Sequence, residues 1–262
     1  SRKSIILESG DAWSSFWTNL AKKSLLNLTQ EKGNKRNWRP NVLLFNESDK
    51  IRPHLVEMGL SLTGQLGALT DFNVITSPKT ESEANAISAP LLKEKKQNYF
   101  TREFHSDSFA NGIKTVSSVY GFSGFEPNTV LMSWSREVQN ANFLADILND
   151  LKTKNLNVVF LDYDKKNGFG KKQKIDIWWD GQGRFLSFAL NILRFLSSDP
   201  SWRDVQVRIL TINGQTALHD SIIRNTKAII SDKRMKAEVK VVNDDFGSRT
   251  REDIINSESM GS

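Results

Sequence analysis

The sequence predicts an α/β protein with two related subdomains, each a mostly parallel sheet flanked by helices. Short apolar runs bounded by turn residues alternate along the chain with helical patterns, as in folds built from β-α-β crossovers. Residues 157–161 are an almost uninterrupted apolar run, which is typical of a strand covered by helices on both faces. A similar strand-and-helix passage also occurs twice, and this repetition indicates two related halves.

The first element in chain order is an N-terminal helix over residues 11–30, which Asp11 can cap. Large apolar side chains recur along it and form a broad stripe that includes Trp13, Phe16, Trp17 and Leu20. Three aromatic rings so near one end must pack against another surface. Residues 1–36 are therefore interpreted as an N-terminal segment, a helix with a polar exit, that precedes the first subdomain.

The repeated passage begins with Pro-Asn in both copies. Pro40-Asn41 opens an apolar run to residue 45 and precedes a helical pattern over residues 51–66, and Pro127-Asn128 opens a run to residue 132 before a helix over residues 141–151. Proline is tolerated at the first position of a strand because that residue need not donate to the ladder. The repeat predicts a first subdomain at residues 37–122 and a second at residues 123–245, with a boundary within residues 121–128.

The remaining elements follow the same alternation. In the first half we expect strands at residues 72–76 and 98–104, a helix at 81–97 that Pro90 should kink, and a helix at 107–119. The second half predicts strands at 157–161, 174–179, 205–209 and 238–242, with helices at 185–196 and 215–231. Residues 246–262 form a polar tail that we expect to fray.

Composition narrows the functional classes. Of the 262 residues, 38% are hydrophobic and 25% are charged, which fits a globular chain with a sizeable core. The absence of cysteine excludes disulfides, thiolate catalysis and cysteine-ligated metals, and it fits a reducing cytoplasm. The longest uncharged stretch, residues 58–70, is shorter than the roughly 20 apolar residues of a spanning helix, and no secretory signal is expected at the N-terminus.

The sequence contains no recognisable catalytic constellation, so we expect neither an enzyme nor a bound cofactor or metal. His54, His105 and His219 lie far apart, and no phosphate-binding loop or nucleophile elbow is present. Asp162 and Asp164 follow a strand, where an α/β enzyme places carboxylates, so a small-molecule enzyme remains an alternative. Gly181-Gln182-Gly183 lies between a strand and a helix, and it fits either an anion site or a tight turn.

A lysine-rich loop leads into the strand at 174–179. Its basic residues are Lys165, Lys166, Lys171, Lys172 and Lys174. The net charge of +6 fits an ordinary soluble surface, and for this loop the alternatives are a solvated turn and contact with anionic lipid headgroups. Nucleic acid is not an expected partner, because the aromatic residues occupy core-type positions and do not interleave with basic ones.

The helix at 185–196 has little polar face. Its large apolar side chains include Phe185, Leu186, Phe188, Ile192 and Phe195. Such a helix is either buried on all sides or covered by a partner, so it is the candidate packing or dimer helix.

Five of these segments, in the same order, resemble the C-terminal cytosolic domain of cation-chloride cotransporters, the sodium-potassium-chloride and potassium-chloride carriers. They are Asn37-Trp38-Arg39-Pro40-Asn41, Arg52-Pro53-His54-Leu55, Pro127-Asn128-Thr129-Val130, Ile175-Asp176-Ile177-Trp178-Trp179, and Trp202-Arg203 with Val207-Arg208-Ile209-Leu210. Ser133-Trp134 and Gly181-Gln182-Gly183 depart from the family pattern. The long phosphorylated insertion of animal members is missing, so a prokaryotic member is the better match.

The resemblance implies a regulatory and dimerisation domain at the cytoplasmic face of the cell membrane, without catalysis. Its expected partners are the membrane-embedded part of the same chain and a second copy, with the helix at 11–30 as the connection. Ion-binding residues of this family lie in the membrane part, so none is carried over. The fold is also similar to that of universal stress proteins and other Rossmann-like folds, and a nucleotide-sensing module is the alternative function.

Overall fold

The computed structural model describes residues 9–30, 38–47, 52–76, 98–122, 125–134, 141–181, 185–244, 247 and 249–259. Its strands form a five-stranded sheet in the order β3-β2-β1-β4-β5 and a three-stranded sheet in the order β6-β7-β8. All strand pairs in both sheets are parallel, so the predicted α/β class is confirmed. The strands are β1 Asn41–Glu47, β2 Ala68–Ile75, β3 Tyr99–His105, β4 Thr129–Ser133, β5 Asn157–Leu161, β6 Lys174–Trp178, β7 Gln206–Asn213 and β8 Glu238–Asn243. The helices are α1 Ser9–Gln30, α2 Pro53–Thr63, α4 Phe109–Val119, α5 Ala141–Thr153, α6 Phe185–Leu196, α7 His219–Asp232 and α8 Arg251–Ser259.

The two Pro-Asn passages are neighbours in one sheet, and this corrects the expected boundary at residues 121–128. Strand β4 pairs with β1, and β5 pairs with β4, so both belong to the first sheet. The Asn128 N–H donates to the Asn41 carbonyl at 3.0 Å, and the Asn41 N–H donates to the Asn128 side chain at 3.2 Å. The repeat thus marks two matched strand starts, and the chain passes to the second sheet only between β5 and β6.

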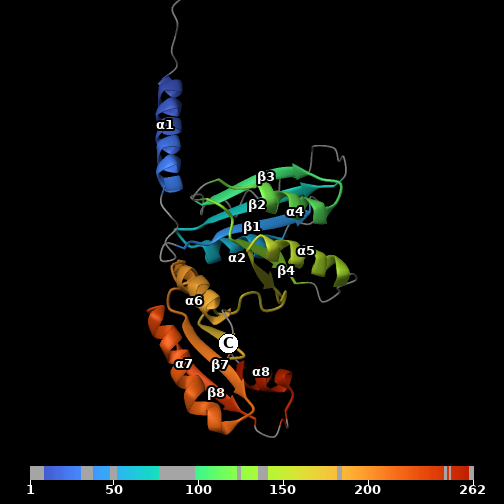
Figure 1. Cartoon of the computed structure of the whole chain (residues 1–262), viewed down its shortest axis with the longest axis vertical. Coiled ribbons are helices and arrows are strands. Elements are labelled where there is room, and N and C mark those ends of the chain that lie inside the picture. Colours follow the sequence, from blue (N-terminus) through green and yellow to red (C-terminus); the bar gives the residue numbers. More distant parts are fainter. Residues whose placement is uncertain are drawn as a thin grey trace, which may run out of the picture.

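The first sheet is covered on both faces, as Figure 1 shows. Helices α4 and α5 pack on one face over Leu43, Phe45 and Val130, while α2 lies on the other over Val42 and Leu44. Strand β1 is buried at five consecutive positions because it runs through the middle of this arrangement.

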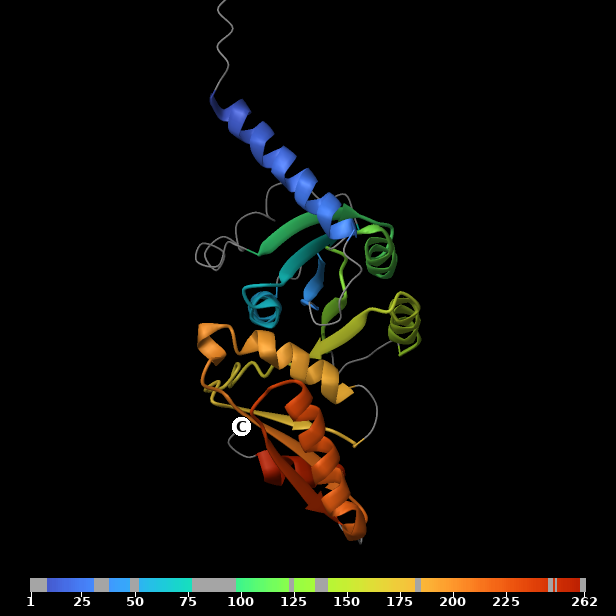
Figure 2. The same ribbon diagram turned by 60° about the vertical axis from the view of Figure 1, so that its left-hand side comes forward.

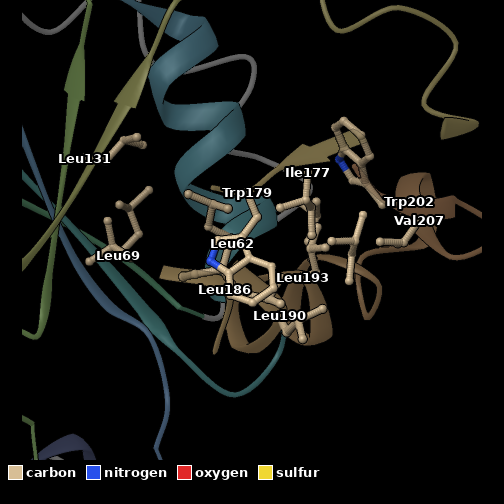
Figure 3. Close-up of a cluster of buried hydrophobic side chains, with 14 of the residues drawn as sticks. Leu62, Leu69, Leu131, Ile177, Trp179, Leu186, Leu190, Leu193, Trp202 and Val207 are labelled. Atoms are coloured by element: carbon tan, nitrogen blue, oxygen red, sulfur yellow. The ribbon is translucent and has the colours of Figure 1, made fainter. Parts of the chain in front are cut away.

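A single apolar core joins the two sheets. Helix α6 lies between them (Figures 1 and 2). Its buried side chains belong to one cluster with residues of α2 and the first sheet and with residues of β6 and β7. Figure 3 shows the centre of this shared core, where Leu69 and Leu131 of the first sheet and Ile177 and Val207 of the second lie around the same cluster. The two sheets are therefore parts of one packed body.

The joint between α2 and α6 is held by a buried polar contact and a close backbone approach. The Ser61 hydroxyl donates to a carboxylate oxygen of Asp199 at 2.7 Å, just beyond the end of α6. Gly64 ends α2 with φ 55° and ψ −145°, and a Cβ there would lie 2.3 Å from the Ser198 hydroxyl. Glycine is required at this position because other residues rarely adopt that conformation and would also collide with α6.

The C-terminal segment is a helix packed on the second sheet, which corrects the expected frayed tail. Ile254 of α8 is buried, and the indole N–H of Trp178 donates to the Ser259 hydroxyl at 3.1 Å. Arg208 of β7 donates to the Glu258 carbonyl at 2.9 Å. A short polar helix is ordered here because its few inward contacts fall on a sheet face that would otherwise be open.

The expected helix at 81–97, with Pro90, lies outside the described residues. None of the helices that the structure describes is both long and apolar enough to cross a membrane.

Candidate functional site

Of the two carboxylates that follow β5, Asp164 shapes a turn. Asp164 accepts hydrogen bonds from the Lys166 N–H at 2.8 Å and from the Asn167 amide at 2.6 Å, while Asp162 is exposed. Among the described residues, no group of three or more His, Asp or Glu side chains is arranged to hold a metal ion.

The three histidines lie in separate environments. His54 stacks on Tyr163 with ring centroids 4.4 Å apart, and burial, followed by the charges of Arg52 and Lys165, lowers its pKa. The His219 ring lies beside the Asn243 side chain, and His105 is exposed at the end of β3. None of the three approaches another within a shared site.

The basic loop is anchored to the body through one of its lysines. Lys172 pairs with Glu57 of α2 at 2.9 Å, and its ammonium group lies 5.3 Å from the centre of the Trp202 ring. Lys174 is half-buried in β6, whereas Lys165, Lys166 and Lys171 are exposed. The structure therefore separates the five lysines into the anchored Lys172, the half-buried Lys174 and three exposed residues.

The candidate dimer helix is α6, and most of it lies in the shared core. Leu186, Ile192 and Phe195 are buried, Phe188 is half-buried, and Phe185 is 55% exposed at the start of the helix. Trp38 packs edge-on against both Phe188 and Phe195, with ring centroids 6.2 and 5.9 Å apart. Of the five candidates, Phe185 alone presents a largely exposed ring.

Two of the family-like segments meet across the second sheet. Asp176 of β6 and Arg208 of β7 are register partners, and the Arg208 guanidinium donates two hydrogen bonds to the Asp176 carboxylate at 2.8 and 2.6 Å. The Asp176 side chain is only 5% exposed, because α8 covers this face. These segments supply the two halves of a structural ion pair, and the sequence alone did not link them.

A buried polar cluster lies on the first sheet beside α2. Asp71 accepts hydrogen bonds from the Tyr99 hydroxyl and the Asn46 side-chain amide, both at 2.9 Å, and the buried side-chain oxygen Oδ1 of Asn46 has no hydrogen-bond partner among the described residues. Burial raises the pKa of Asp71, and burial together with the Asp71 charge raises that of Tyr99. Asn46 stands near the end of β1, where the strand order reverses between β1 and β4, and ligands of α/β folds bind at such switch points.

Of the glycine pair after β6, only Gly181 lies within the described residues. Its φ of 83° fits the expected tight turn, while Gln182 and Gly183 lie outside the described residues.

An exposed apolar surface lies at the opposite end of the first sheet, where α1 meets it. Most of α1 extends away from the body (Figures 1 and 2), and Trp17 and Leu20 are 59% and 45% exposed. Phe16 is also more than half exposed, whereas the side chain of Trp13 lies outside the described set. The first sheet therefore does not cover the apolar stripe of α1, which the sequence predicts to pack against another surface.

The same surface continues on the body as exposed phenylalanines around an open cavity of about 440 Å³. Phe100 comes from β3, and Phe122 and Phe125 from the segment that leads to β4. None of these phenylalanines was predicted from the sequence as a functional residue. Val119, Phe122 and Phe125, which lie between a helix and the Pro-Asn turn, are nevertheless a local signal of exposed apolar residues.

Comparisons with known proteins relate the chain to one family of carriers. It is 26% identical over 238 residues to potassium/chloride cotransporter 3 of Caenorhabditis elegans, an alignment that covers 79% of this chain and 21% of that protein. It is 22% identical over 260 residues to cation-chloride cotransporter 1 of Oryza sativa subsp. japonica, covering 89% of this chain and 26% of the relative. The chain therefore spans about a fifth to a quarter of the length of these relatives. No family model matches it.

The fold matches a solved structure of the same kind. The crystal structure of the cytoplasmic domain of a prokaryotic cation chloride cotransporter aligns with a TM-score of 0.62 and 14% identity, covering 79% of this chain and 80% of that one. The resemblance to cation-chloride cotransporters and the α/β fold expected from it are both confirmed.

Proposed function

We propose that this chain, a relative of the cation-chloride cotransporters, is the cytoplasmic regulatory and dimerisation domain of such a carrier. The observation that carries the proposal is the fold shared with the cytoplasmic domain of a prokaryotic cotransporter, together with sequence similarity to a fifth or a quarter of whole carriers. In this role the domain binds neighbouring protein, transports no ions and performs no catalysis. It acts at the cytoplasmic face of the membrane as part of a chain that also has a membrane-embedded portion.

Helix α1 is the element best suited to connect the domain with that portion. It extends away from the first sheet and carries Trp17 and Leu20 on an exposed flank, and neither side chain belongs to the two hydrophobic cores. Exposed aromatic side chains of this size are enriched at protein interfaces. In the dimer we place this flank against the second copy or the membrane portion of the carrier.

The self-association of the chain tests the dimerisation role. We expect sedimentation velocity over a concentration series to detect a weak dimer, and Trp17→Glu to weaken it at least about tenfold, as for a central aromatic contact. Leu218→Glu is the matched control, since Leu218 is also exposed but belongs to the second sheet's side of the molecule. Equal loss of association in both variants would argue against an α1 interface.

Transport by a whole carrier that contains this domain tests the regulatory role. We expect a carrier reconstituted in vesicles to lose regulation of chloride-coupled cation uptake, and to dissociate more readily, when residues 38–259 are deleted. Attachment to a membrane portion raises the effective concentration of the domains, so a weak contact in the isolated chain is sufficient for a dimer there. Unchanged uptake and an unchanged dimer after the deletion would refute the proposal.

The alternative is a nucleotide-sensing module like the universal stress proteins, and one feature favours it. The side-chain oxygen Oδ1 of Asn46, which has no hydrogen-bond partner within the described part of the chain, lies near the switch point between β1 and β4, where such a ligand would bind. Isothermal titration with ATP, ADP and AMP separates the two functions. Micromolar binding that Asn46→Ala abolishes would favour the sensor, and no heat of binding would favour the regulatory domain.

Contact of the exposed lysines with anionic lipid headgroups is a further part of the proposal. The loop carries Lys165, Lys166 and Lys171 on its exposed side, and each basic residue near an anionic surface contributes about 1 kcal/mol. Co-sedimentation with vesicles of phosphatidylglycerol should weaken when the three are changed to glutamine. Binding that is unaffected by this change would leave the loop a solvated turn.

A further inference from the structure

The open cavity beside α1 has the size of a small-molecule site. Its volume is about 440 Å³, within the range of about 300–1,000 Å³ that is common for ligand pockets. The floor is formed by the beginnings of β1 and β2, one wall by β3 together with Tyr120, Phe122, Phe125 and Pro127, and the opposite wall by Ala21 and Ser24 of α1. It lies at the end of the sheet opposite to the switch point.

The lining is almost entirely apolar. Phe100, Phe122 and Phe125 are 48%, 57% and 48% exposed, although side chains of this size are usually buried. The hydroxyls of Thr70 and Tyr120 are satisfied by each other at 3.2 Å, so they add little unused polarity to the cavity. The surface therefore favours an apolar ligand body that would remove these rings from water.

One cation stands in this lining. Arg102 of β3 is exposed, and its guanidinium donates to the Thr101 carbonyl at 3.3 Å. No carboxylate of the residues that the structure describes forms an ion pair with it. A guanidinium presents several donors in one plane and binds carboxylates and phosphates through pairs of hydrogen bonds.

From these features we propose that the cavity binds a single-chain amphiphile with an anionic head, such as a free fatty acid. The chain occupies the space among the phenylalanines, and the head pairs with Arg102. Because Ala21 and Ser24 form one wall, an occupied cavity also fixes the C-terminal part of α1 against the first sheet. This inference goes beyond the proposed function and does not depend on it.

Isothermal titration with free alkyl acids, below the concentration at which they form micelles, tests the ligand class. We expect decanoate to bind one site per chain, and affinity to rise about fourfold per methylene from hexanoate to decanoate, as apolar burial predicts. Decylamine, which has the same chain and the opposite charge, should bind at least about tenfold more weakly. Equal binding of decanoate and decylamine, or binding to phosphatidylglycerol vesicles without binding of free decanoate, would overturn the proposal.

Three variants test the place of binding. Arg102→Gln should weaken decanoate binding about tenfold or more, as expected for a charged hydrogen-bonding partner, and reduce the preference over decylamine. Ser24→Trp should block the cavity without disturbing the body, because Ser24 is exposed on α1. Arg224→Gln is the matched control, since it removes an equally exposed arginine from α7. Full binding by Arg102→Gln and Ser24→Trp, or equal loss in Arg224→Gln, would contradict the assignment.

Hydrogen exchange provides a readout of the effect on α1. Bound decanoate should slow amide exchange in residues 20–30 and in β3, and leave α7 and β8 unchanged. In Ser24→Trp this ligand-induced protection should disappear. Protection spread evenly over the chain would indicate unspecific binding of a detergent-like molecule and would defeat the proposal.

Discussion

The two sheets differ in how they obtain a core. The first has an apolar cluster of its own under α4 and α5, built on Leu43, Phe72 and Val130, in addition to its part of the shared core. The second has three strands and one strongly apolar face, and that face belongs to the shared core. Its other face is occupied by the Asp176–Arg208 pair and covered by the short helix α8.

This difference shows which part depends on the other. Small sheets bury too little apolar surface to be stable alone, whereas a sheet covered on both faces retains a core if one side is lost. We therefore expect the second sheet to unfold whenever the shared core opens, and the first to be more tolerant.

The largest effect should come from Leu190→Ala. Leu190 of α6 is fully buried in the shared core, and its truncation should cost about 2–5 kcal/mol of unfolding free energy. Urea denaturation gives the cost, and hydrogen exchange should show loss of protection in β6–β8 before β1. Ile147→Ala in the other core is the control: it should cost a similar amount but spare β6–β8. If the two variants lower protection in the same strands, the proposed dependence is wrong.

Breaking the ion pair between Asp176 and Arg208 should have the next largest effect. Asp176→Ala removes the carboxylate that accepts two hydrogen bonds from the half-buried Arg208, which keeps its bond to the Glu258 carbonyl, so we expect a loss of about 2–3 kcal/mol in chemical denaturation. The double variant Asp176→Leu/Arg208→Met should recover most of this loss, because it removes both charges. A double variant as unstable as the single one would mean that packing, and not the unpaired charge, causes the loss.

Gly64→Ala should follow, since it affects the joint between the two sheets. The φ and ψ values disfavour any other residue, and the new Cβ would also approach the Phe195 carbonyl oxygen at 2.8 Å, so a cost of about 1–3 kcal/mol is expected in thermal or urea unfolding. Gly214→Ala is the control, because a Cβ there has open space and the backbone is not left-handed. Similar stability of the two variants would remove Gly64 from the joint.

The smallest effect depends on pH and concerns Asp71. Asp71 faces the α2 side of the first sheet with Tyr99 and Asn46 as its partners, and burial raises its pKa. The folded state therefore binds the proton of the Asp71 carboxyl group more tightly than the unfolded state does. The contribution of protonated Asp71 to the free energy of unfolding is present below about pH 4 and is lost as the pH rises through the raised pKa.

Urea denaturation at a series of pH values from about 4 to 7 measures this effect. Asp71→Asn should remove the corresponding slope, since an amide does not titrate. Asp232→Asn at the exposed end of α7 should leave the slope as it is in the unaltered protein. A slope that persists in Asp71→Asn would assign it to another group.

Most elements could be predicted from local patterns. Strand β5 was expected at residues 157–161 and helix α6 at 185–196, and both have these bounds, because their apolar runs are long or strongly periodic. Helix α8 was missed, since one buried isoleucine among polar residues carries no periodic signal. Strand β2 begins four residues earlier than expected because Ala68 and Leu69 pair with Asn41 and Val42 of β1.

The site was less predictable than the fold. The Pro-Asn repeat was recognised but assigned to two halves, because nothing in the local sequence says that β4 pairs with β1. The phenylalanines around the cavity and Arg102 come from separate segments and converge only in the folded chain.

The sequence by itself determined the alternation of strands and helices, the parallel sheets and the relation to cotransporters, since these follow from short-range periodicity and ordered motifs. Tertiary structure alone decided which strands share a sheet, that α6 is a shared core element, and that α1 leaves an apolar cavity beside β3. Strand partners and helix contacts are selected by the burial of surfaces from distant segments. That free energy depends on the whole packed arrangement, which no single window of residues encodes.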